Sequence, residues 1–246
     1  MMAMTPSPPA SGIPRRIVSD YLVNLLEFDY PVKYVPCMAI HAPRQTKPSR
    51  TGKTRAALIA AGLDLLVERP IDAIPIDDFV ARAGVAKGSF FNHFKDKQDF
   101  AAAVATEVRM EVEALVGQAN DGVADPVARM AGGMAVAARV AIEQPRRMMV
   151  LLRSLVPATS QTNPLNRGLK DDIDAALEQG LLRPEARKLG VTYWLGLCQV
   201  LMMHLIEIRP SRDLAAERLA DMLLMGLTGI GVPHAKAELY ARETRL

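Results

Sequence analysis

The sequence predicts an all-helical protein. Half of its 246 residues are hydrophobic, but only 5% are aromatic, and Ala, Leu and Met are prominent among the rest. These three residue types favour helices, whereas strands favour aromatic and β-branched residues. From Thr51 onward, apolar residues recur at spacings of three and four, which is the period of one buried helix face.

The first fifty residues differ from the rest of the chain, because prolines interrupt them throughout. A short apolar-periodic piece between Ile17 and Phe28 fits one helix, which either docks elsewhere or stays without structure. We expect residues 1–50 to form an irregular basic extension. The sequence leaves open whether residues 1–37 are ordered, and whether translation starts at Met38.

Three helical segments are expected next. The first covers Gly52 to Glu68, and the second begins with Pro75 and ends at Gly84. The third runs from Ala86 to Phe94, and Asp96 is then placed to cap a longer helix. Two short helices joined by a tight glycine turn, above a first helix that supplies an apolar floor, indicate a helix-turn-helix.

In such a unit the second helix enters the DNA major groove, and its N-terminal residues meet the base edges. Here that helix opens with Lys87 and Ser89 and then offers Asn92 and His93, which are hydrogen-bonding residues with one cation. We therefore predict a DNA-binding domain over residues 51–100.

The run from Phe79 to Phe100, FVARAGVAKGSFFNHFKDKQDF, resembles the DNA-binding signature of the TetR family of bacterial transcriptional regulators. The matching elements are the turn Ala83-Gly84-Val85, the opening Lys87-Gly88-Ser89, the cluster of Phe91, His93 and Phe94, and Lys97 followed by Phe100. The resemblance implies a homodimer that binds a palindromic double-stranded operator and responds to a small-molecule effector.

Three positions depart from the family pattern, and one of them is Pro70, which stands where Gly is common. The family usually has Tyr at the position of Phe91 and a hydroxyl residue at the position of Pro75, so two phosphate contacts are missing here. More of the phosphate binding is then expected from Lys97, Lys87 and the basic run between His41 and Arg55.

The charge distribution is consistent with this expectation. Residues 1–100 contain 13 Lys and Arg against 10 Asp and Glu, whereas residues 101–246 contain 17 of each. The basic run holds no acid, which is typical either of an arm for a polyanion or of a solvated linker. The predicted DNA contacts are Arg50, Lys53, Arg55, Lys87, Ser89, Phe91, Asn92, His93 and Lys97.

Residues 101–246 are predicted to form a helical effector-binding and dimerisation domain. Its expected helices beyond residue 118 are Pro126–Glu143, Pro145–Leu155, Asn163–Gln179, Pro184–Ile208 and Asp213–Ile230. The span from Leu189 to Ile206 is apolar enough to raise the question of a membrane helix, but Gln199 and His204 argue against one. We expect it to be buried, and the resemblance implies that the last two helices pair with those of a partner subunit.

Methionines are concentrated in this half of the chain. Because methionine is flexible and polarizable, such a group suits a cavity for apolar ligands, although core packing is the alternative explanation. The predicted effector pocket comprises Met134, Met148, Met149, Leu152, Trp194 and Cys198.

No catalytic, metal-binding or cofactor motif is expected, because the four histidines are scattered and no phosphate loop or nucleophile elbow is present. Cys37 and Cys198 have no disulfide or metal spacing, and prolines occupy the place of a secretory signal, so a cytoplasmic protein is expected. The predicted function is a transcriptional repressor that an apolar effector releases from DNA. The alternative is a helical ligand carrier or interaction module with an unused helix-turn-helix.

Overall fold

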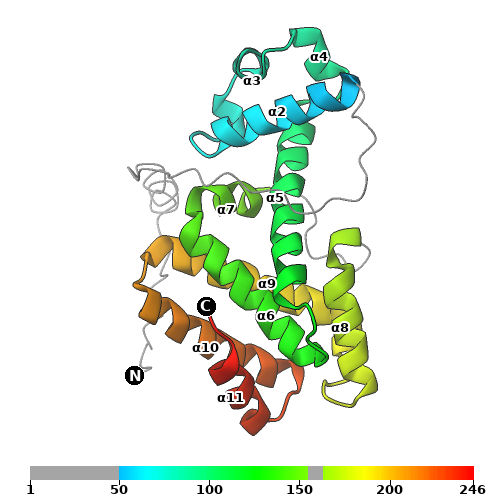
Figure 1. The fold of residues 1–246 in the computed structure, drawn as a ribbon, viewed down its shortest axis with the longest axis vertical. Helices are drawn as coiled ribbons and strands as arrows, with labels where there is room; N and C mark the ends of the chain where they lie inside the picture. Colours follow the sequence, from blue (N-terminus) through cyan, green and yellow to red (C-terminus); the bar gives the residue numbers. More distant parts are fainter. Residues whose placement is uncertain (1–49, 155–162) are drawn as a thin grey trace, which may run out of the picture. The chain divides into compact units, whose positions relative to one another are not determined.

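The computed structural model describes residues 50–154 and 163–246, and within these ranges every regular element is a helix (Figure 1). The predicted fold class is confirmed: a helix-turn-helix unit comes first, and a larger helical domain follows. The helix expected near Ile17 and most of the basic run lie outside the described residues.

The helix-turn-helix unit comprises α2 (Arg50–Leu66), the short 3-10 helix η1 (Ile71–Ala73), α3 (Ile76–Ala83), α4 (Lys87–Phe91) and the first turns of α5 (Lys97–Ala119). Four phenylalanines fill its core: Phe79, Phe90, Phe94 and Phe100, each at most 3% exposed. The Phe100 ring lies 4.8 to 5.2 Å from the centroids of the other three. This edge-to-face and tilted packing fixes α3 and α4 against the start of α5.

The turn between α3 and α4 has the predicted glycine. Gly84 has a φ of 66°, in the left-handed region that glycine adopts without the steric cost of a Cβ. Pro75 was expected to be the first helical residue, but its extended backbone makes it the N-cap of α3. The predicted helix Ala86–Phe94 is also too long, because α4 ends at Phe91 and the chain turns to bury Phe94.

Helix α5 links the two parts of the described chain. Asp96 caps it as predicted, since its side chain accepts a 2.8 Å hydrogen bond from the Asp99 backbone N–H. Phe100 and Val104 belong to the core of the helix-turn-helix unit, whereas Val108 and Val112 belong to a cluster further along the helix. One continuous helix therefore contributes to both cores.

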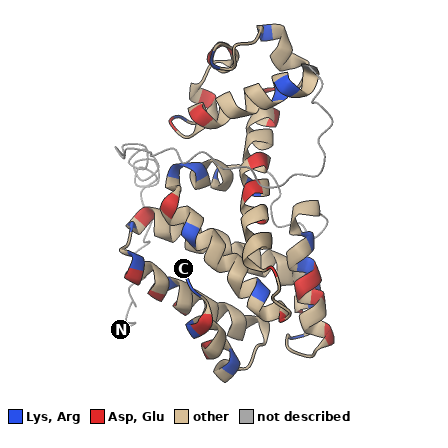
Figure 2. Ribbon diagram, viewed as in Figure 1, with Lys and Arg blue, Asp and Glu red and all other residues tan. Residues whose placement is uncertain are grey.

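The second part of the chain comprises α6 (Pro126–Glu143), α7 (Pro145–Leu152), η2 (Pro164–Asn166), α8 (Arg167–Glu178), α9 (Ala186–Ile208), α10 (Arg212–Ile230) and α11 (His234–Glu243). Helix α6 packs against α5, α8, α9 and α10, and most of its residues are buried. The ribbon of α6 carries few charges, whereas α8 carries both signs (Figure 2).

Several predicted boundaries were wrong. Helix α7 ends at Leu152 instead of Leu155, and the expected helix from Asn163 begins as a 3-10 turn. Helix α11 was not predicted, because only Ala237 and Ala241 of its ten residues are buried and its apolar period is weak. Two of these errors adjoin the residues that the structure does not describe.

Helix α11 is fixed by a hydrogen bond to the start of α6. The Tyr240 hydroxyl donates to Asp125 at 2.6 Å, and the Asp125 carboxylate also accepts from the backbone N–H groups of Val127 and Ala128. Burial acts to raise the pKa of Asp125, but these hydrogen bonds and the charge of Arg129 lower it below the usual value. The same hydrogen bond adds to burial in raising the pKa of Tyr240 to about 12.

Helix α9 has the length and hydropathy of a membrane span, but half of its most apolar window is buried within the fold. Trp194, Leu201 and Leu205 are each at most 2% exposed and belong to the core. These contacts explain one side of the helix as core packing, but the expected burial of the whole span is wrong, because Leu189, Val200 and Met203 are each more than half exposed.

Candidate functional site

The predicted DNA-binding residues lie on three neighbouring elements of the helix-turn-helix unit. Lys53 and Arg55 lie on α2, Lys87 opens α4, and the chain turns out of α4 at Asn92. These four residues are exposed, whereas Ser89, His93 and Lys97 are half-buried. Arg50 begins α2, but its side chain lies outside the described structure.

Phe91 is unusual among the aromatic residues of this unit because it is 55% exposed. Its ring contacts the buried Phe90 edge-on, with 5.4 Å between centroids. An exposed aromatic at the end of a helix held by a rigid core offers an apolar surface for a thymine methyl or a sugar. The geometry is compatible with a DNA contact that does not require the missing phenol.

Two of the cations make weak contacts within the chain. The Lys87 ammonium lies 2.8 Å from Asp77, and both side chains are largely exposed. The Arg55 guanidinium lies 5.5 Å from the centroid of the Phe94 ring. Exposed pairs of this kind contribute about 0 to 1 kcal/mol, so both cations can turn toward an anion at little cost.

Lys97 has a different environment. Its ammonium donates to the backbone carbonyls of Ile71, Asp72 and Ile74 at 3.0 to 3.2 Å. All three ammonium protons therefore have acceptors within the chain. The predicted phosphate contact by Lys97 stays a prediction, and the structure adds a second role in fixing the connection before α3.

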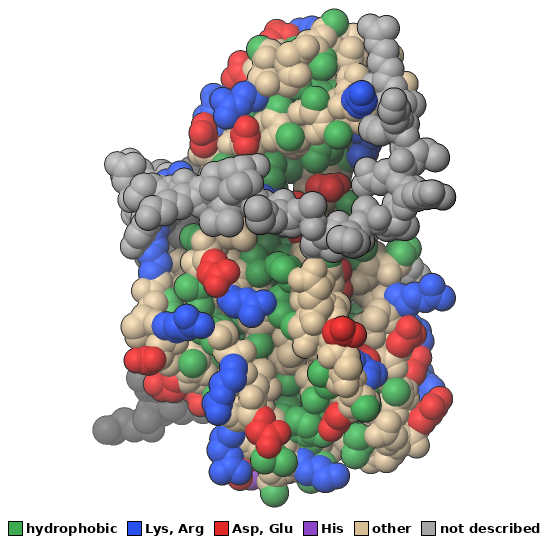
Figure 3. Space-filling view, in the orientation of Figure 1, with side chains coloured by type: hydrophobic (Ala, Val, Ile, Leu, Met, Phe, Trp, Pro, Cys, Tyr) green, Lys and Arg blue, Asp and Glu red, His purple; other side chains and the backbone are tan. Residues whose placement is uncertain are grey.

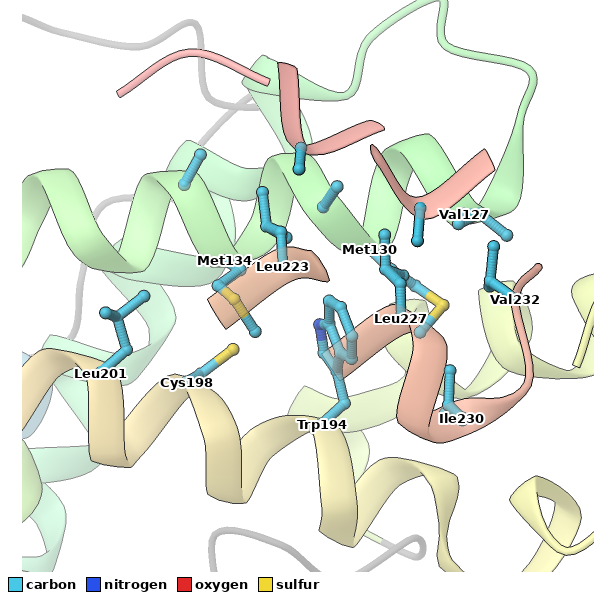
Figure 4. Packing of buried hydrophobic residues seen from close by; sticks show 14 of the residues in the cluster. Val127, Met130, Met134, Trp194, Cys198, Leu201, Leu223, Leu227, Ile230 and Val232 are labelled. Atoms are coloured by element: carbon cyan, nitrogen blue, oxygen red, sulfur yellow. The ribbon is translucent and has the colours of Figure 1, made fainter. Parts of the chain in front are cut away.

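Three of the predicted effector residues come together in the core between α6, α9 and α10. The sulfur atoms of Met134 and Cys198 point toward one another, and the Trp194 ring lies beside them (Figure 4). All three side chains are buried in the largest apolar cluster of the described chain.

The other three predicted effector residues lie in a second cluster. Met148 is buried there, and Met149 and Leu152 pack against it from the same helix, α7. The members of this cluster from other helices are Val108, Val112, Val136, Ala137, Val140, Ala141, Met202 and Ile206. The six residues therefore divide between two cores that meet along α6 and α9.

Sequence reasoning missed a group of polar residues beside these cores. Arg109 on α5 forms an ion pair with Glu113 at 2.6 Å and donates a 3.1 Å hydrogen bond to the Asn166 side chain. Asn166 is 1% exposed, and burial raises the pKa of Glu113 despite the nearby Arg109. Only the separation of four residues between Arg109 and Glu113 on α5 could have drawn attention to them.

Among the described residues, no group of three or more His, Cys, Asp or Glu side chains is arranged to hold a metal ion.

Charged side chains of both signs are interspersed over the face shown in Figure 3, with hydrophobic side chains between them.

An apolar surface lies on α9 and α10. Leu189, Val200 and Met203 of α9 and Met225 of α10 are each more than half exposed. Gly196 lies on α9 in line with Val200 and Met203, and a Cβ at Gly196 would meet no atom of the chain within 4 Å. We call these five residues the α9–α10 face.

Gly226 lies on α10, one of the two helices expected to pair with a partner subunit, but it does not belong to this face. It is buried, and a Cβ there would lie 2.8 Å from Leu197 and 3.3 Å from the Trp194 ring of the same chain. Its small size serves the packing of α10 on α9 within one subunit.

Comparisons with known proteins agree with this geometry. The sequence-family model described as bacterial regulatory proteins of the tetR family matches residues 58–104, from α2 into α5. The transcriptional regulator AcuR of Cereibacter sphaeroides is 32% identical over 104 residues, which are 41% of this chain and 48% of that protein. The transcriptional repressor DhaR of a Mycobacterium species is 31% identical over 77 residues, 31% of this chain and 39% of that protein.

The match thus spans about half the length of these curated relatives or less. A larger part of the fold is shared with RolR, whose crystal structure in complex with resorcinol has a TM-score of 0.57. That similarity covers 80% of this chain and 97% of RolR at 23% sequence identity.

A phenylalanine-packed helix-turn-helix joined by one long helix to a larger helical domain defines the class of helix-turn-helix regulators. Within that class, residues 58–104 of this chain match the tetR family of bacterial regulatory proteins.

Proposed function

We propose that this protein is a cytoplasmic transcriptional repressor that binds a palindromic operator as a homodimer and is released by a small-molecule effector. The observation that carries the proposal is the tetR-family region itself, which presents Lys87, Ser89, Phe91 and Asn92 at its surface over a rigid core. AcuR is a transcriptional regulator and DhaR a transcriptional repressor, which supports the same function.

In the proposed complex, α4 enters the major groove. Ser89 and Asn92 hydrogen-bond to base edges, and Phe91 makes apolar contacts. Lys53, Arg55 and Lys87 bind phosphates, and Arg50 is a further proposed phosphate contact. Because Asp77 and the Phe94 ring hold Lys87 and Arg55 only weakly, both cations are available to the phosphates.

The α9–α10 face is the proposed dimer interface. Exposed leucine, valine and methionine side chains gain about 25 cal/mol for each Å² of apolar surface that a partner covers. The open position at Gly196 allows two copies of α9 to approach closely. A two-fold axis at this interface would give the dimer two copies of α4. We expect these two helices to lie about 34 Å apart on DNA.

Helix α7 is the proposed link between effector and DNA. Met148 lies in the cluster that contains predicted effector residues, whereas Val150 is buried with the core of the helix-turn-helix unit. An effector that fits only a shifted α7 would therefore change the placement of α2. A coupling of about 1–3 kcal/mol lowers DNA affinity roughly 5- to 150-fold.

RolR binds resorcinol in its crystal structure, which is consistent with a fold that accommodates small, largely apolar ligands. In the present chain, the candidate pocket residues are Met134, Met148, Met149, Leu152, Trp194 and Cys198.

The test is binding of the full chain to DNA selected from a random duplex pool and to the DNA beside its own gene. We expect a two-fold symmetric footprint, with an affinity that falls steeply as salt rises because several phosphates are neutralised. Absence of any salt-dependent DNA binding would contradict the proposal and favour a ligand carrier with an unused helix-turn-helix.

A further inference from the structure

Arg109, Glu113 and Asn166 form a polar group beside an apolar core: Asn166 is buried, whereas the Glu113 side chain is 30% exposed. Asn166 is the one polar residue among the fully buried side chains of the described chain, and Arg109 is only 15% exposed. Burying such groups is unfavourable unless each finds a partner. The arrangement therefore requires a reason beyond packing.

The hydrogen bonding of Arg109 is incomplete. One terminal nitrogen serves both Glu113, at 2.6 Å, and Asn166, at 3.1 Å. The Nε atom is buried and has no hydrogen-bond partner among the described residues, and it is the only such side-chain atom in that part of the protein. A buried donor without an acceptor is rare in folded proteins, so an acceptor from outside the described chain would stabilise this group.

Val108 and Val112, next to Arg109 and Glu113 on α5, belong to the cluster that contains Met148. Asn166 immediately precedes α8, whose Ile173 belongs to the core that contains Trp194 and Met134. Cys198 belongs to that core, and the charges of both Arg109 and Glu113 act on its thiol. Burial is the main reason that the pKa of Cys198 rises to about 12, so the thiol stays neutral beside the ion pair. A molecule placed along Met134, Trp194 and Cys198 would bring one end to Arg109.

The charges limit the chemistry of that end. Arg109 is already neutralised by Glu113, so a second carboxylate would place two negative charges next to one cation in a partly buried site. A neutral oxygen avoids this repulsion: a carbonyl or hydroxyl accepts from Nε, and a hydroxyl can also donate to Glu113. A hydrocarbon would leave Nε without a partner.

We infer that Arg109 binds the effector, and that the effector is a small, largely apolar molecule with a neutral carbonyl or hydroxyl oxygen that accepts a hydrogen bond from Nε. This inference rests on the proposed function, because it names the ligand class of the regulator. It adds Arg109, Glu113 and Asn166 to the apolar residues of the candidate pocket.

The experiment measures binding of six probes to the full chain without DNA: toluene, phenol, benzoate, hexane, 1-hexanol and hexanoate. Trp194 is the only tryptophan of the protein, so its fluorescence reports on the pocket, and the melting temperature gives a second signal. We expect phenol or 1-hexanol to bind about tenfold more tightly than the hydrocarbon or carboxylate of the same shape.

Two variants test the assignment. Arg109→Lys keeps the charge but has no Nε donor, and the double variant Arg109→Met with Glu113→Gln removes the ion pair without leaving one charge unpaired. Both should lose the preference for the neutral oxygen while binding the hydrocarbon as before, which shows that the pocket is intact. Arg242→Lys, on the exposed side of α11, is the matched control and should keep the preference.

The inference is overturned if the carboxylates bind most tightly, if alcohol and hydrocarbon bind equally, or if no probe changes either signal up to its solubility limit. It is also overturned if both variants fold and retain the preference. If the variants fail to fold, the ranking of the six probes on the unmodified protein still decides whether the inference holds. If the unmodified protein ranks the probes as expected but does not bind DNA, the proposed function is contradicted while the inference about Arg109 stands.

Discussion

The ammonium of Lys97 donates to the backbone carbonyl of Ile74 at 3.0 Å, across 23 residues of the chain. Because the same ammonium also reaches the carbonyls of Ile71 and Asp72, the first residue of α5 fixes the connection that leads into α3. A lysine that also bound a phosphate would have to keep these bonds or give some of them up.

Lys97→Met separates the two roles. The change keeps the apolar stem but removes three charge-assisted hydrogen bonds, so we expect the free energy of unfolding to fall by about 1–3 kcal/mol. Thermal unfolding measures this loss. If Lys97 also binds a phosphate, the slope of log affinity against log salt flattens by about one unit, and an unchanged slope assigns it to structure alone.

Ser89→Ala and Asn92→Ala should change which base pairs are preferred, because these residues are predicted to read base edges. A lost base contact typically costs about 1–3 kcal/mol on the preferred sequence and little on others. Lys87→Gln is the comparison, since a lost phosphate contact weakens binding to all sequences about equally. Selection of DNA from a random pool by each variant measures the difference, and identical preferences in all of them would exclude base reading by Ser89 and Asn92.

Met203→Glu should convert a dimer into a folded monomer and abolish tight operator binding. The side chain is 56% exposed on the α9–α10 face, so the change leaves the subunit core intact but puts a charge into the proposed interface. Leu239→Glu, at an apolar and 44% exposed position on α11, is the control and should stay dimeric. Sedimentation velocity checks both proteins, and a dimeric Met203→Glu would place the interface elsewhere.

Gly226→Glu is expected to behave differently from Met203→Glu. Its side chain would collide with Leu197 and Trp194 within one subunit, so the protein should unfold or aggregate before any effect on dimerisation can be read. Gly226→Ala should change the free energy of unfolding by less than about 1 kcal/mol, because the Leu197 methyl can shift and alanine favours a helix over glycine. Circular dichroism during heating measures both variants, and a Gly226→Glu protein with an unchanged melting temperature would contradict the close approach of α9 and α10.

Tyr240→Phe should lower stability at neutral pH and have less effect in acid. The pKa of Asp125 is below its usual value in the folded protein, so its contribution is present above the unfolded pKa of about 3.9 and is lost as pH falls through the folded value. Because Asp125 is partly exposed, the effect of removing the hydroxyl should not exceed about 1 kcal/mol. Urea unfolding at neutral and acid pH tests this, and an equal loss at both would assign the effect to packing.

The sequence was most informative where local chemistry decides the structure. Gly84 and Asp96 were predicted from the demands of a left-handed turn and a helix cap, and both occupy those places. The end of α4 depended on the burial of Phe94, which is a tertiary contact. Helix α11 depends on the hydrogen bond between Tyr240 and Asp125, which are 115 residues apart, and no periodicity encodes that bond.

The functional residues also divide into those that the sequence reveals and those that only the fold brings together. The DNA-binding residues are close in sequence and could be listed together, although the carbonyl contacts of Lys97 could not be foreseen. Arg109 and Asn166 are 57 residues apart, so only the fold brings them together. The division of the predicted effector residues between two clusters likewise follows from the packing of α7 away from Trp194.

Val150 lies on α7 but belongs to the same buried cluster as Leu58, Phe79 and Phe94 of the helix-turn-helix core. A hybrid regulator made by joining residues 50–100 of this protein to the helical domain of a relative would lose that side chain and gain whatever the relative has there. Such an exchange should succeed only when the incoming α7 supplies a side chain of similar volume at this position. A hybrid should therefore exchange the helix-turn-helix unit together with α7, although α7 begins well after residue 100 in the sequence.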